Sequence, residues 1–539
     1  MSSTPTTLLD LIRPIPDTAT AVIVPEQNIK VTYGALRSNV EALAEQLSAA
    51  GVQRGDRIGI ALPNGLPIVV AFLAAAEIGT AAPLNPAYKE DDFTFYLDDT
   101  NAKVLILPPD GAEEARRALR KAQGERPVRD LPIDMDANGT VTLTTISDRK
   151  PYTRPTPDDV ALILHTSGST GRPKRVPLKH ANLTISAQNV ARHYKLTKDD
   201  VAMCVMPLFH VHGLVASTLA TLSTGGALVV PAKFNPLSFW RTARDTGMTW
   251  YSAVPTIHQL LLARGADPDR RPEGAAKLRF IRSCSAALPP PVMQALEKAF
   301  GAPVLEAYGM TEAAHQMASN PLPPEERRGG SVGHGTDVQI GITDDAGNLL
   351  APGQHGEVVI KGPNVITGYE NNPEANAKSF THGWFRTGDQ GFLDEKGYLT
   401  LVSRIKEPIN RGGEKISPRE IDEVLLTHPA VAEAVAFGMP HATWGEEVAA
   451  AVVVKSDGGA VSESDLLTFC KEKLADFKRP KRIHIMTTIP RTATGKMELE
   501  GIVGAVVELG EKLDVPVPCT RTVHAAAKLM DEARGARKS

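Results

Sequence analysis

Short apolar runs alternate with longer amphipathic segments from the N-terminus to about residue 310. Trp250–Val254 is typical of the runs, and Tyr33–Ala49, with apolar residues at helical spacing, is typical of the segments between them. This alternation predicts parallel sheets covered by helices, with ligand sites in the loops beyond the carboxyl ends of the strands. The other predicted strands are Arg57–Leu62, Lys103–Leu107, Ala161–His165, Val201–Pro207, Ala227–Pro231, Leu278–Ser283 and Val304–Ala307, and Pro291–Phe300 is a further predicted helix.

Two long stretches, Ile58–Ala76 and Leu214–Ala232, contain no charged residue. Turn-forming residues interrupt both of them, at Gly65 in the first and at Gly225 in the second. Each stretch is therefore interpreted as a buried strand and a buried helix joined by a turn, and not as a membrane span.

The pattern changes after about Ser331, where turn signals become dense and only short strands such as Glu357–Lys361 fit between them. This part predicts a small antiparallel, barrel-like section. A compact α+β stretch then follows and ends near Lys496. The chain is thus predicted to be α/β, with a large N-terminal domain of parallel-type sheets plus the barrel-like section at residues 1–404 and a small α+β domain at residues 405–497. Residues 498–539 are predicted to form an atypical helical tail.

Charge and cysteine content change this picture little. The 59 Lys and Arg residues nearly balance the 62 Asp and Glu residues, giving a formal net charge of −3. That balance gives no reason to expect nucleic acid or an anionic membrane as a partner. The four cysteines are far apart, which favours a reducing compartment. We expect a cytoplasmic protein; a peroxisomal location stays open, although the chain does not end in Ser-Lys-Leu.

The most informative segment is Thr166–Lys174, which follows a predicted buried strand and reads Thr-Ser-Gly-Ser-Thr-Gly-Arg-Pro-Lys. Small side chains let backbone N–H groups approach an anion closely, and the hydroxyls and basic side chains add donors and positive charge. We interpret the segment as a polyphosphate-binding loop, although the common GxxxxGK[ST] motif does not fit it. The alternative is an ordinary Ser/Gly surface loop.

Three further motifs follow in order: Leu305–Glu312, which contains Tyr-Gly-Met-Thr-Glu; Tyr398–Glu407; and Pro490–Lys496, which reads Pro-Arg-Thr-Ala-Thr-Gly-Lys. Together with Thr166–Lys174 they resemble the adenylate-forming superfamily of acyl-CoA synthetases, luciferases and peptide-synthetase adenylation domains, over about residues 5 to 497. The resemblance implies two steps: a carboxylate attacks the α-phosphorus of ATP to give an acyl adenylate, and the thiol of coenzyme A then displaces AMP. It also implies Mg²⁺ as a cofactor.

The same resemblance assigns a role to each nucleotide-binding position. Glu312 would hold Mg²⁺, Thr311 would bond the α-phosphate, and Asp389 would accept hydrogen bonds from the ribose hydroxyls, with Arg404 in support. In isolation, Glu312 is better explained as a solvated carboxylate at a helix start, and Asp389 as a turn residue. The remaining implied ATP-binding residues are Thr166, Ser167, Gly168, Ser169, Thr170, Gly171, Lys174, Ala286, Ala287, Glu306, Ala307 and Tyr308.

Lys496 is the predicted catalytic residue, because its ammonium could bridge the attacking carboxylate and the α-phosphate. The alternative is an exposed lysine without a role. In the family the C-terminal domain rotates between the two steps, and Lys406 matches the hinge. Pro408 stands where an apolar strand residue is usual, so the hinge strand is expected to be altered. The residues predicted to admit coenzyme A are Gly412, Gly413 and Lys415.

Three polar residues fall where the family lines its acid site: His210, Ser285 and His315. A polar pocket suits a small acid with a second carboxylate, because each buried oxygen needs a partner. The local sequence looks most similar to oxalate–CoA ligases, so oxalate is the predicted substrate. A medium-chain fatty or aromatic acid is the alternative, and His315 could instead be a helix histidine satisfied by a backbone carbonyl.

The tail from Glu498 to Leu529 is similar to the C-terminal helices of 2-dehydropantoate 2-reductases, but it carries no dinucleotide fingerprint and predicts no reductase activity. An alternative from another class is a nucleotide- or acid-binding sensor that has kept the fold without turnover. A monomer or homodimer that acts on a small carboxylic acid, ATP and coenzyme A, without nucleic acid or membrane, is expected.

Overall fold

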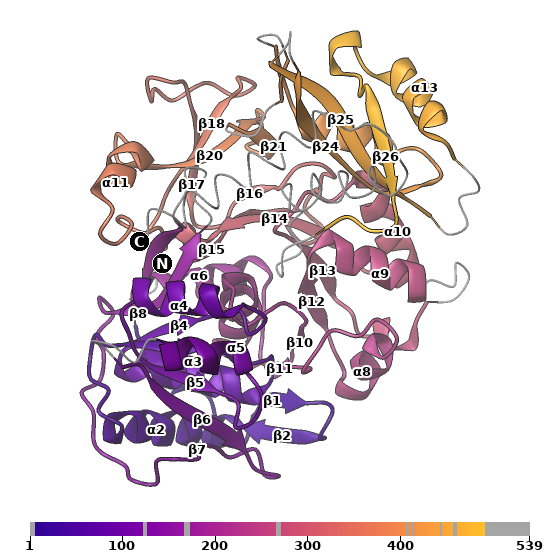
Figure 1. Ribbon diagram of the computed structural model, residues 1–539. Helices are drawn as coiled ribbons and strands as arrows, with labels where there is room; N and C mark the ends of the chain where they lie inside the picture. The colour runs from indigo at the N-terminus through magenta and orange to yellow at the C-terminus, as the bar shows by residue number, and fades with distance from the viewer. Residues whose placement is uncertain are drawn as a thin grey trace. The chain divides into compact units, whose positions relative to one another are not determined.

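The structure, a computed structural model, describes residues 6–121, 127–166, 173–265, 271–405, 409–411, 414–441, 445–455 and 461–490 (Figure 1). These residues form two compact units. The first unit is drawn from Met1–Gly341, Val359–Arg386 and Lys396–Leu399, and the second from Ile342–Val358, Thr387–Glu395 and Thr400–Ser539. Mixed α/β structure in both units confirms the predicted fold class.

A nine-stranded sheet in the first unit carries most of the candidate site, and its central strands from β14 to β1 run parallel. Parallel strands need crossover connections, and helices supply them here. In spatial order the strands are β16 (His334–Gly335), β15 (His315–Ser319), β14 (Val304–Met310), β13 (Phe280–Ser283), β12 (Trp250–Ala253), β10 (Val201–Cys204), β11 (Ala227–Val229), β1 (Thr20–Val24) and β2 (Ile29–Thr32).

A second, seven-stranded sheet completes the first unit, with a parallel centre and an antiparallel pair at each edge. Its strands are β7 (Val141–Leu143), β6 (Arg129–Met135), β5 (Ala102–Leu107), β3 (Arg57–Ile60), β4 (Thr80–Pro83), β8 (Val160–Thr166) and β9 (Lys174–Lys179).

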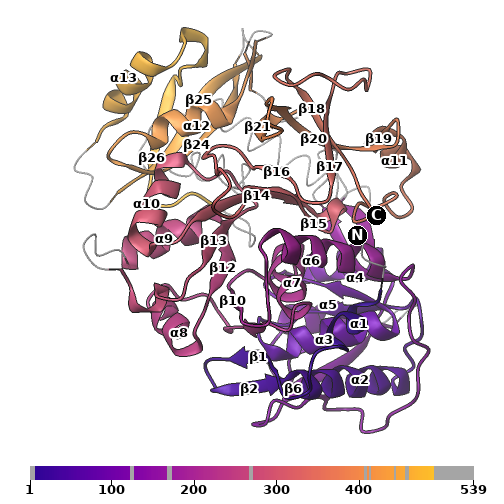
Figure 2. The same cartoon turned by 180° about the vertical axis from the view of Figure 1, so that it is seen from behind.

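The helices of the first unit follow the predicted pattern. Helix α2 (Tyr33–Ala49) has the predicted bounds, because the hydroxyl of Thr32 accepts a hydrogen bond from the amide of Ala35 and caps its first turn. Residues of α8, α9 and α10 share one hydrophobic core with the strands β10 to β14, beside which Figure 2 shows them. The other helices are α1 (Leu8–Ile12), α3 (Leu66–Ile78), α4 (Glu90–Asp99), α5 (Glu113–Lys121), α6 (His180–His193), the π-helix η1 (His212–Leu219), α7 (Ala220–Leu222), α8 (Phe239–Thr246), α9 (Pro255–Gly265), η2 (Glu273–Ala275), α10 (Pro290–Phe300), η3 (Thr311–Ala313) and α11 (Pro373–Ser379).

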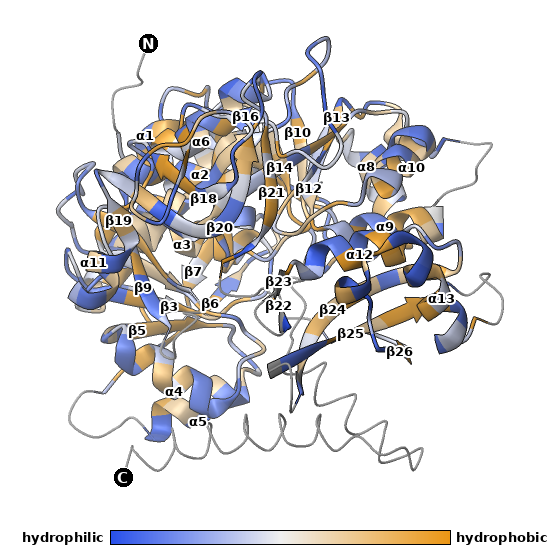
Figure 3. Ribbon diagram, turned by 90° about the horizontal axis from the view of Figure 1, so that it is seen from above, coloured by the Kyte–Doolittle hydropathy of each residue, from blue (hydrophilic) through white to orange (hydrophobic). Residues whose placement is uncertain are grey.

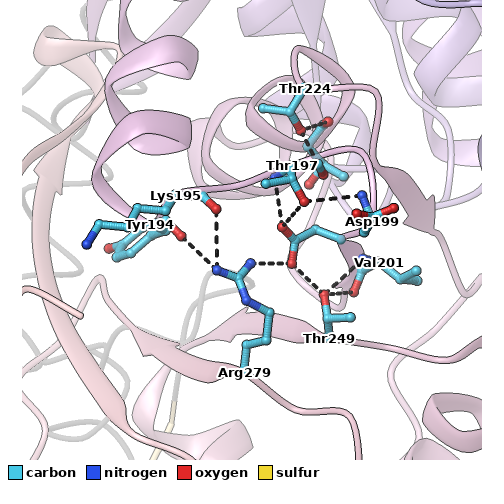
Figure 4. A network of polar contacts seen from close by, with 10 residues as sticks. Tyr194, Lys195, Thr197, Asp199, Val201, Thr224, Thr249 and Arg279 are labelled. Atoms are coloured by element: carbon cyan, nitrogen blue, oxygen red, sulfur yellow. Dashed lines mark hydrogen bonds and ion pairs between the residues drawn. The ribbon is translucent and has the colours of Figure 1, made fainter. Parts of the chain in front are cut away.

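A polar network fixes the amino ends of three neighbouring parallel strands (Figure 4). Asp200, Thr249 and Arg279 each stand one residue before a strand of the nine-stranded sheet. The carboxylate of Asp200 is buried and accepts hydrogen bonds from the backbone amide of Thr197, from the hydroxyl of Thr249 at 2.8 Å and from the guanidinium of Arg279. Charged groups are thus satisfied at this edge of the sheet, while the loops at the opposite, carboxyl edge carry the candidate site residues.

A five-stranded sheet with an antiparallel β19–β20 pair corresponds to the predicted barrel-like section, and the chain passes between the two units within its strands β17, β18, β20 and β21. Its strands are β17 (Gln339–Thr343), β18 (Gly356–Lys361), β20 (Trp384–Leu393), β19 (Phe380–Thr381) and β21 (Leu399–Arg404).

Among the described residues, the second unit contains a further five-stranded sheet and the two α-helices α12 (Pro418–Leu426) and α13 (Glu463–Lys473). Figure 3 shows both hydrophilic and hydrophobic residues on these helices, and Ile421, Leu425, Leu466 and Cys470 are buried in a core shared with the strands. The elements besides the helices are β23 (Glu414–Ile416), β22 (Ile409–Arg411), β25 (Gly445–Val454), β24 (Val431–His441), β26 (Arg482–Met486) and the short 3₁₀ helix η4 (Asp476–Lys478).

Three cysteines of the described chain, Cys204, Cys284 and Cys470, are buried free thiols. Burial raises the pKa of Cys204 to about 12 and that of Cys470 to about 11. No helix in the described part of the chain is both long and apolar enough to span a bilayer.

Candidate active site

The phosphate loop predicted from the sequence connects two strands of a hairpin. Strands β8 and β9 pair antiparallel, and Thr166 stands opposite Lys174 as the last pair before the loop. The hairpin therefore holds the first and last members of the predicted loop beside each other. The residues between them, Ser167, Gly168, Ser169, Thr170 and Gly171, lie outside the described residues, and their phosphate-binding role stays a prediction.

Glu312, the predicted magnesium ligand, lies in η3 directly after β14 and is 5% exposed. The hydroxyl of Tyr369 donates a 2.8 Å hydrogen bond to its Oε1, and the ammonium of Lys174 lies 4.5 Å from the centre of the same tyrosine ring. Burial, together with the neighbouring charge of Glu312, raises the pKa of Tyr369, so its hydroxyl keeps its proton and remains a donor. Tyr369 thus links the end of the β8–β9 hairpin to the carboxylate, a contact that no sequence pattern indicated.

The donors around Glu312 fit a magnesium ion that is shared with a nucleotide. No group of three or more His, Cys, Asp or Glu side chains is placed to hold a metal within the described ranges. Mg²⁺ is typically bound by one or two carboxylates together with phosphate oxygens and water, and one buried, oriented carboxylate next to a phosphate hairpin meets that need. Glu312 would hold the ion, which when bound would neutralise phosphate charge.

Further predicted ATP-binding residues lie on two adjacent parallel strands, with Ala286 and Ala287 after β13 and residues 306–308 within β14. Strands β13 and β14 pair with Ser283 opposite Glu306, so the exposed loop residues Ala286 and Ala287 leave the sheet beside Ala307 and Tyr308. The side chain of Glu306 is buried and accepts a hydrogen bond from the backbone amide of Gly330 at 2.9 Å. Glu306 is therefore committed at least in part to a loop.

Asp389 and Arg404, predicted to bind the ribose, form an ion pair within the second unit. The Nε atom of Arg404 lies 2.8 Å from Oδ1 of Asp389, on the neighbouring strands β21 and β20. Asp389 is 7% exposed, and its backbone amide donates to the hydroxyl of Thr387. The ion pair orients the carboxylate, while its contact with a ribose stays a prediction.

The predicted acid-binding residues gather around a histidine that sequence reasoning did not select. His212 begins η1, is fully buried, and its Nδ1 lies 3.0 Å from the hydroxyl of Ser285. The ring of His315 packs edge-on against the ring of His212 with 5.0 Å between centroids. His210, half-buried, accepts a hydrogen bond from the backbone amide of His212 through its own Nδ1. The structure thus brings all three predicted residues to His212.

Burial and nearby positive charge keep the rings of His212 and His315 neutral. Burial lowers the pKa of His212 well below its usual value, and the neighbouring His315 and Arg282 lower it further. Burial likewise lowers the pKa of His315 well below its usual value, again with a contribution from Arg282. Neutral imidazoles act both as donors and as acceptors of hydrogen bonds, which makes their tautomers part of the site's chemistry.

Unusual backbone geometry marks the same place. Ser285 has φ of 71° and His315 has φ of 108°, values that L-residues adopt rarely. A Cβ atom on Gly309 would come within 2.3 Å of the carbonyl oxygen of His315, so only glycine fits the Tyr-Gly-Met-Thr-Glu strand at that point. His315 is the first residue of β15, and not a residue of a helix. These conformations are typical of sites where backbone strain is retained for function.

Several predicted positions fall outside the described residues, namely Lys406, Gly412, Gly413 and Lys496, and so does the tail. For Lys415 the structure gives the backbone, in β23 opposite Asn410. The roles assigned to these residues stay predictions.

The chain matches two protein-family models and is similar to two oxalate–CoA ligases. Residues 15–370 match the family model of AMP-binding enzymes, and residues 420–496 match the model of the AMP-binding enzyme C-terminal domain. An oxalate–CoA ligase from Arabidopsis thaliana is 47% identical over 479 residues, covering 87% of this chain and 92% of the relative. An oxalate–CoA ligase from Saccharomyces cerevisiae is 44% identical over 513 residues, covering 89% and 93%.

A solved structure agrees with these sequence matches. The o-succinylbenzoate coenzyme A synthetase from Bacillus subtilis, in complex with ATP and a magnesium ion, superposes with a TM-score of 0.78 at 30% identity, covering 91% of this chain and 98% of that one.

Proposed function

Because the chain belongs to the AMP-binding enzyme family, we propose that it is an AMP-forming acid–CoA ligase that uses ATP, Mg²⁺ and coenzyme A, with oxalate as its acid. In the first step a carboxylate oxygen of the acid attacks the α-phosphorus of ATP, and pyrophosphate leaves. In the second step the coenzyme A sulfur attacks the acyl carbonyl, and AMP leaves with the electron pair of the broken carbon–oxygen bond. Oxalyl-CoA, AMP and pyrophosphate are the products.

The first step requires that one anion approach another, so neutralisation and positioning of the phosphates account for most of the catalysis. Lys174 and the hydroxyls beginning at Thr166 would hold the phosphates, and Thr311 would donate to the α-phosphate. Glu312, oriented by Tyr369, would hold the magnesium ion. Lys496 would bridge the acid and the α-phosphate as negative charge develops there.

The observation that carries this proposal is the placement of Lys174, Tyr369 and Glu312. One tyrosine contacts both the lysine that closes the phosphate hairpin and the buried carboxylate suited to magnesium. Three segments far apart in the sequence thus meet at one point with complementary chemistry. The polar cluster of His212, Ser285 and His315 supports a small, polar acid, and the two oxalate–CoA ligase relatives support oxalate in particular.

A panel of acids tests the proposal, with AMP release measured for oxalate, octanoate and 4-coumarate, each with and without coenzyme A. We expect oxalate to give the highest rate and turnover to require coenzyme A. Glu312→Gln should lower the rate about 100-fold, because it removes the charge that holds the metal. Glu374→Gln is the matched control, since Glu374 is an exposed residue that pairs with Lys378.

The outcomes separate the alternatives. Octanoate or 4-coumarate outperforming oxalate would refute oxalate as the substrate while leaving the ligase chemistry in place. Binding of ATP without pyrophosphate exchange on any acid would refute the ligase and favour the sensor.

A further inference from the structure

A buried arginine next to the acid-binding cluster has no negatively charged partner among the described residues. Arg282 is in the middle of β13, is fully buried, and its guanidinium contacts four side chains from four other segments. It donates to the hydroxyl of Tyr194 at 3.0 Å, to Oε1 of Gln316 at 2.9 Å and to the hydroxyl of Ser252 at 2.9 Å, and its Nη1 lies 3.3 Å from Nε2 of His212. All four partners are neutral, and no described carboxylate forms an ion pair with it.

An uncompensated buried charge is costly and therefore rare in folded proteins. The same chain shows the usual solution only three residues earlier, where Arg279 pairs with the carboxylate of Asp200. The positive charge of Arg282 is not compensated by a described carboxylate, so it can stabilise an anion that binds at the acid-binding cluster. A fixed cation in the buried, low-dielectric surroundings of the cluster favours an anion beside it without any reorganisation.

The hydrogen bonds also define which way the protons point. A guanidinium can only donate, so Nη1 of Arg282 makes Nε2 of His212 an acceptor. Ser252 accepts from Arg282 and can direct its own proton to the same Nε2, which lies 2.6 Å away. His212, kept neutral by burial and by its positive neighbours, then carries its proton on Nδ1 and donates it to the hydroxyl of Ser285.

The hydroxyl of Ser285 is left with a proton to give. One of its two acceptor positions is taken by His212, and no other partner for the hydroxyl is found among the described residues. Ser285 is partly exposed, in the strained loop that follows β13. It can therefore donate to a ligand oxygen above the cluster.

We propose that Arg282, Ser252 and His212 form a one-way donor relay that makes Ser285 a hydrogen-bond donor to the second, unreacted carboxylate of a dicarboxylic acid. Arg282 is a positioning residue that also supplies the compensating charge, and it sets the preference of the enzyme for a dianion over a monoanion whose second group is uncharged. This inference rests on the proposed ligase function and extends it to the specificity of its acid site.

The test compares oxalate with oxamate, which replaces the second carboxylate by an uncharged amide of the same size. We expect the wild-type enzyme to prefer oxalate in kcat/KM, and Arg282→Gln to reduce that preference at least about tenfold. Ser252→Ala should raise KM for oxalate about tenfold while kcat stays within about threefold, because only binding of the second carboxylate is weakened. KM for ATP should not change in either variant.

Arg279→Gln is the matched control, because it removes a guanidinium from the same strand region that already has its carboxylate partner. It should lower stability and leave the oxalate preference unchanged. Should Arg282→Gln fail to fold, Ser252→Ala still interrupts the relay with the loss of one oxygen atom.

A spectroscopic measurement separates the relay from the substrate. In protein labelled with ¹⁵N-histidine and assigned with His212→Gln, the imidazole of His212 should show the tautomer protonated on Nδ1. An unchanged oxalate preference in folded Arg282→Gln and Ser252→Ala, or a His212 protonated on Nε2, would overturn the relay. A wild-type enzyme that does not turn over oxalate would overturn the proposed substrate. The tautomer of His212 would still show whether the relay exists.

Discussion

At the scale of single residues, the candidate site depends on side chains that orient the predicted site residues through hydrogen bonds. Tyr369 holds Glu312, and Arg282 fixes the hydrogen bonds of His212 through Ser252. Neither Tyr369 nor Arg282 belongs to a motif in the sequence, although Arg282 is a charged residue inside a fully buried strand. Their partners are 57 residues away for Tyr369 and 30 to 88 residues away for Arg282, so only the folded chain shows what they do.

The hydrogen bond from Tyr369 gives a first prediction. Tyr369→Phe keeps the ring beside Lys174 and removes the hydroxyl that orients Glu312. We expect a loss of about tenfold in adenylate formation and a higher magnesium requirement, because a buried carboxylate loses one charge-assisted hydrogen bond. Pyrophosphate exchange titrated with magnesium measures both. Tyr152→Phe, which loses only a 3.5 Å contact with Glu77, is the control, and an equal loss in both variants would contradict the prediction.

A buried acid makes stability depend on pH. Glu77 lies in the apolar helix α3, is 2% exposed, and burial raises its pKa to about 7 from 4.5. The folded protein therefore holds this proton up to a higher pH than the unfolded chain does. The stability associated with Glu77 is full below about pH 4.5 and is lost as pH rises through about 7.

The variant Glu77→Gln should remove this loss. Its melting temperature relative to wild type should rise between about pH 5 and about pH 8, with a change on the order of 3 kcal/mol in relative stability. The difference between the two proteins isolates Glu77 from buried histidines such as His180, whose pKa of about 4 acts in the opposite direction. A constant difference across this range would show that Glu77 does not titrate there.

At the scale of elements, the parallel strands of the nine-stranded sheet could be predicted from the sequence, whereas the antiparallel strand β15 beside β14 could not. Helix α2 has the predicted bounds because a local cap at Thr32 sets its start. By contrast, the predicted strand Val304–Ala307 continues to Met310 and returns as β15, since the glycine at 309 allows His315 to approach the backbone closely. His210, Ser285 and Thr311 do follow the carboxyl ends of β10, β13 and β14, as the alternating pattern indicated, while the partners of Ser285 and His315 depended on long-range packing.

The network at the opposite end of these strands gives a prediction about stability alone. Asp200→Asn keeps the shape of the side chain and removes the negative charge that Arg279 and Thr249 contact. We expect a loss of about 2–4 kcal/mol in the free energy of unfolding, because a buried hydrogen-bonded ion pair is broken. Chemical denaturation measures the loss. The ratio of oxalate to oxamate turnover should stay that of wild type, and a changed ratio would mean that the two ends of the sheet are coupled.

At the scale of the whole molecule, the two half-reactions place different demands on the chain. By resemblance to the family, Lys496 serves adenylate formation and not the thiol step. Lys496→Ala should therefore abolish pyrophosphate exchange while thioester formation from supplied acyl-AMP and coenzyme A continues near the wild-type rate. Lys473→Ala, on an exposed face of α13, is the control. Equal loss of both half-reactions in Lys496→Ala would contradict the assigned role.

The buried cysteines can report separately on the opening of each of the two units. Cys204 and Cys284 belong to the first unit and Cys470 to the second, and a thiol enclosed in a core does not react with a maleimide until that core opens. With Cys519 replaced by serine, the order in which the remaining cysteines are labelled by the maleimide would show which unit opens first. Labelling with ATP or oxalate present would show whether either ligand slows the opening of one unit and not that of the other.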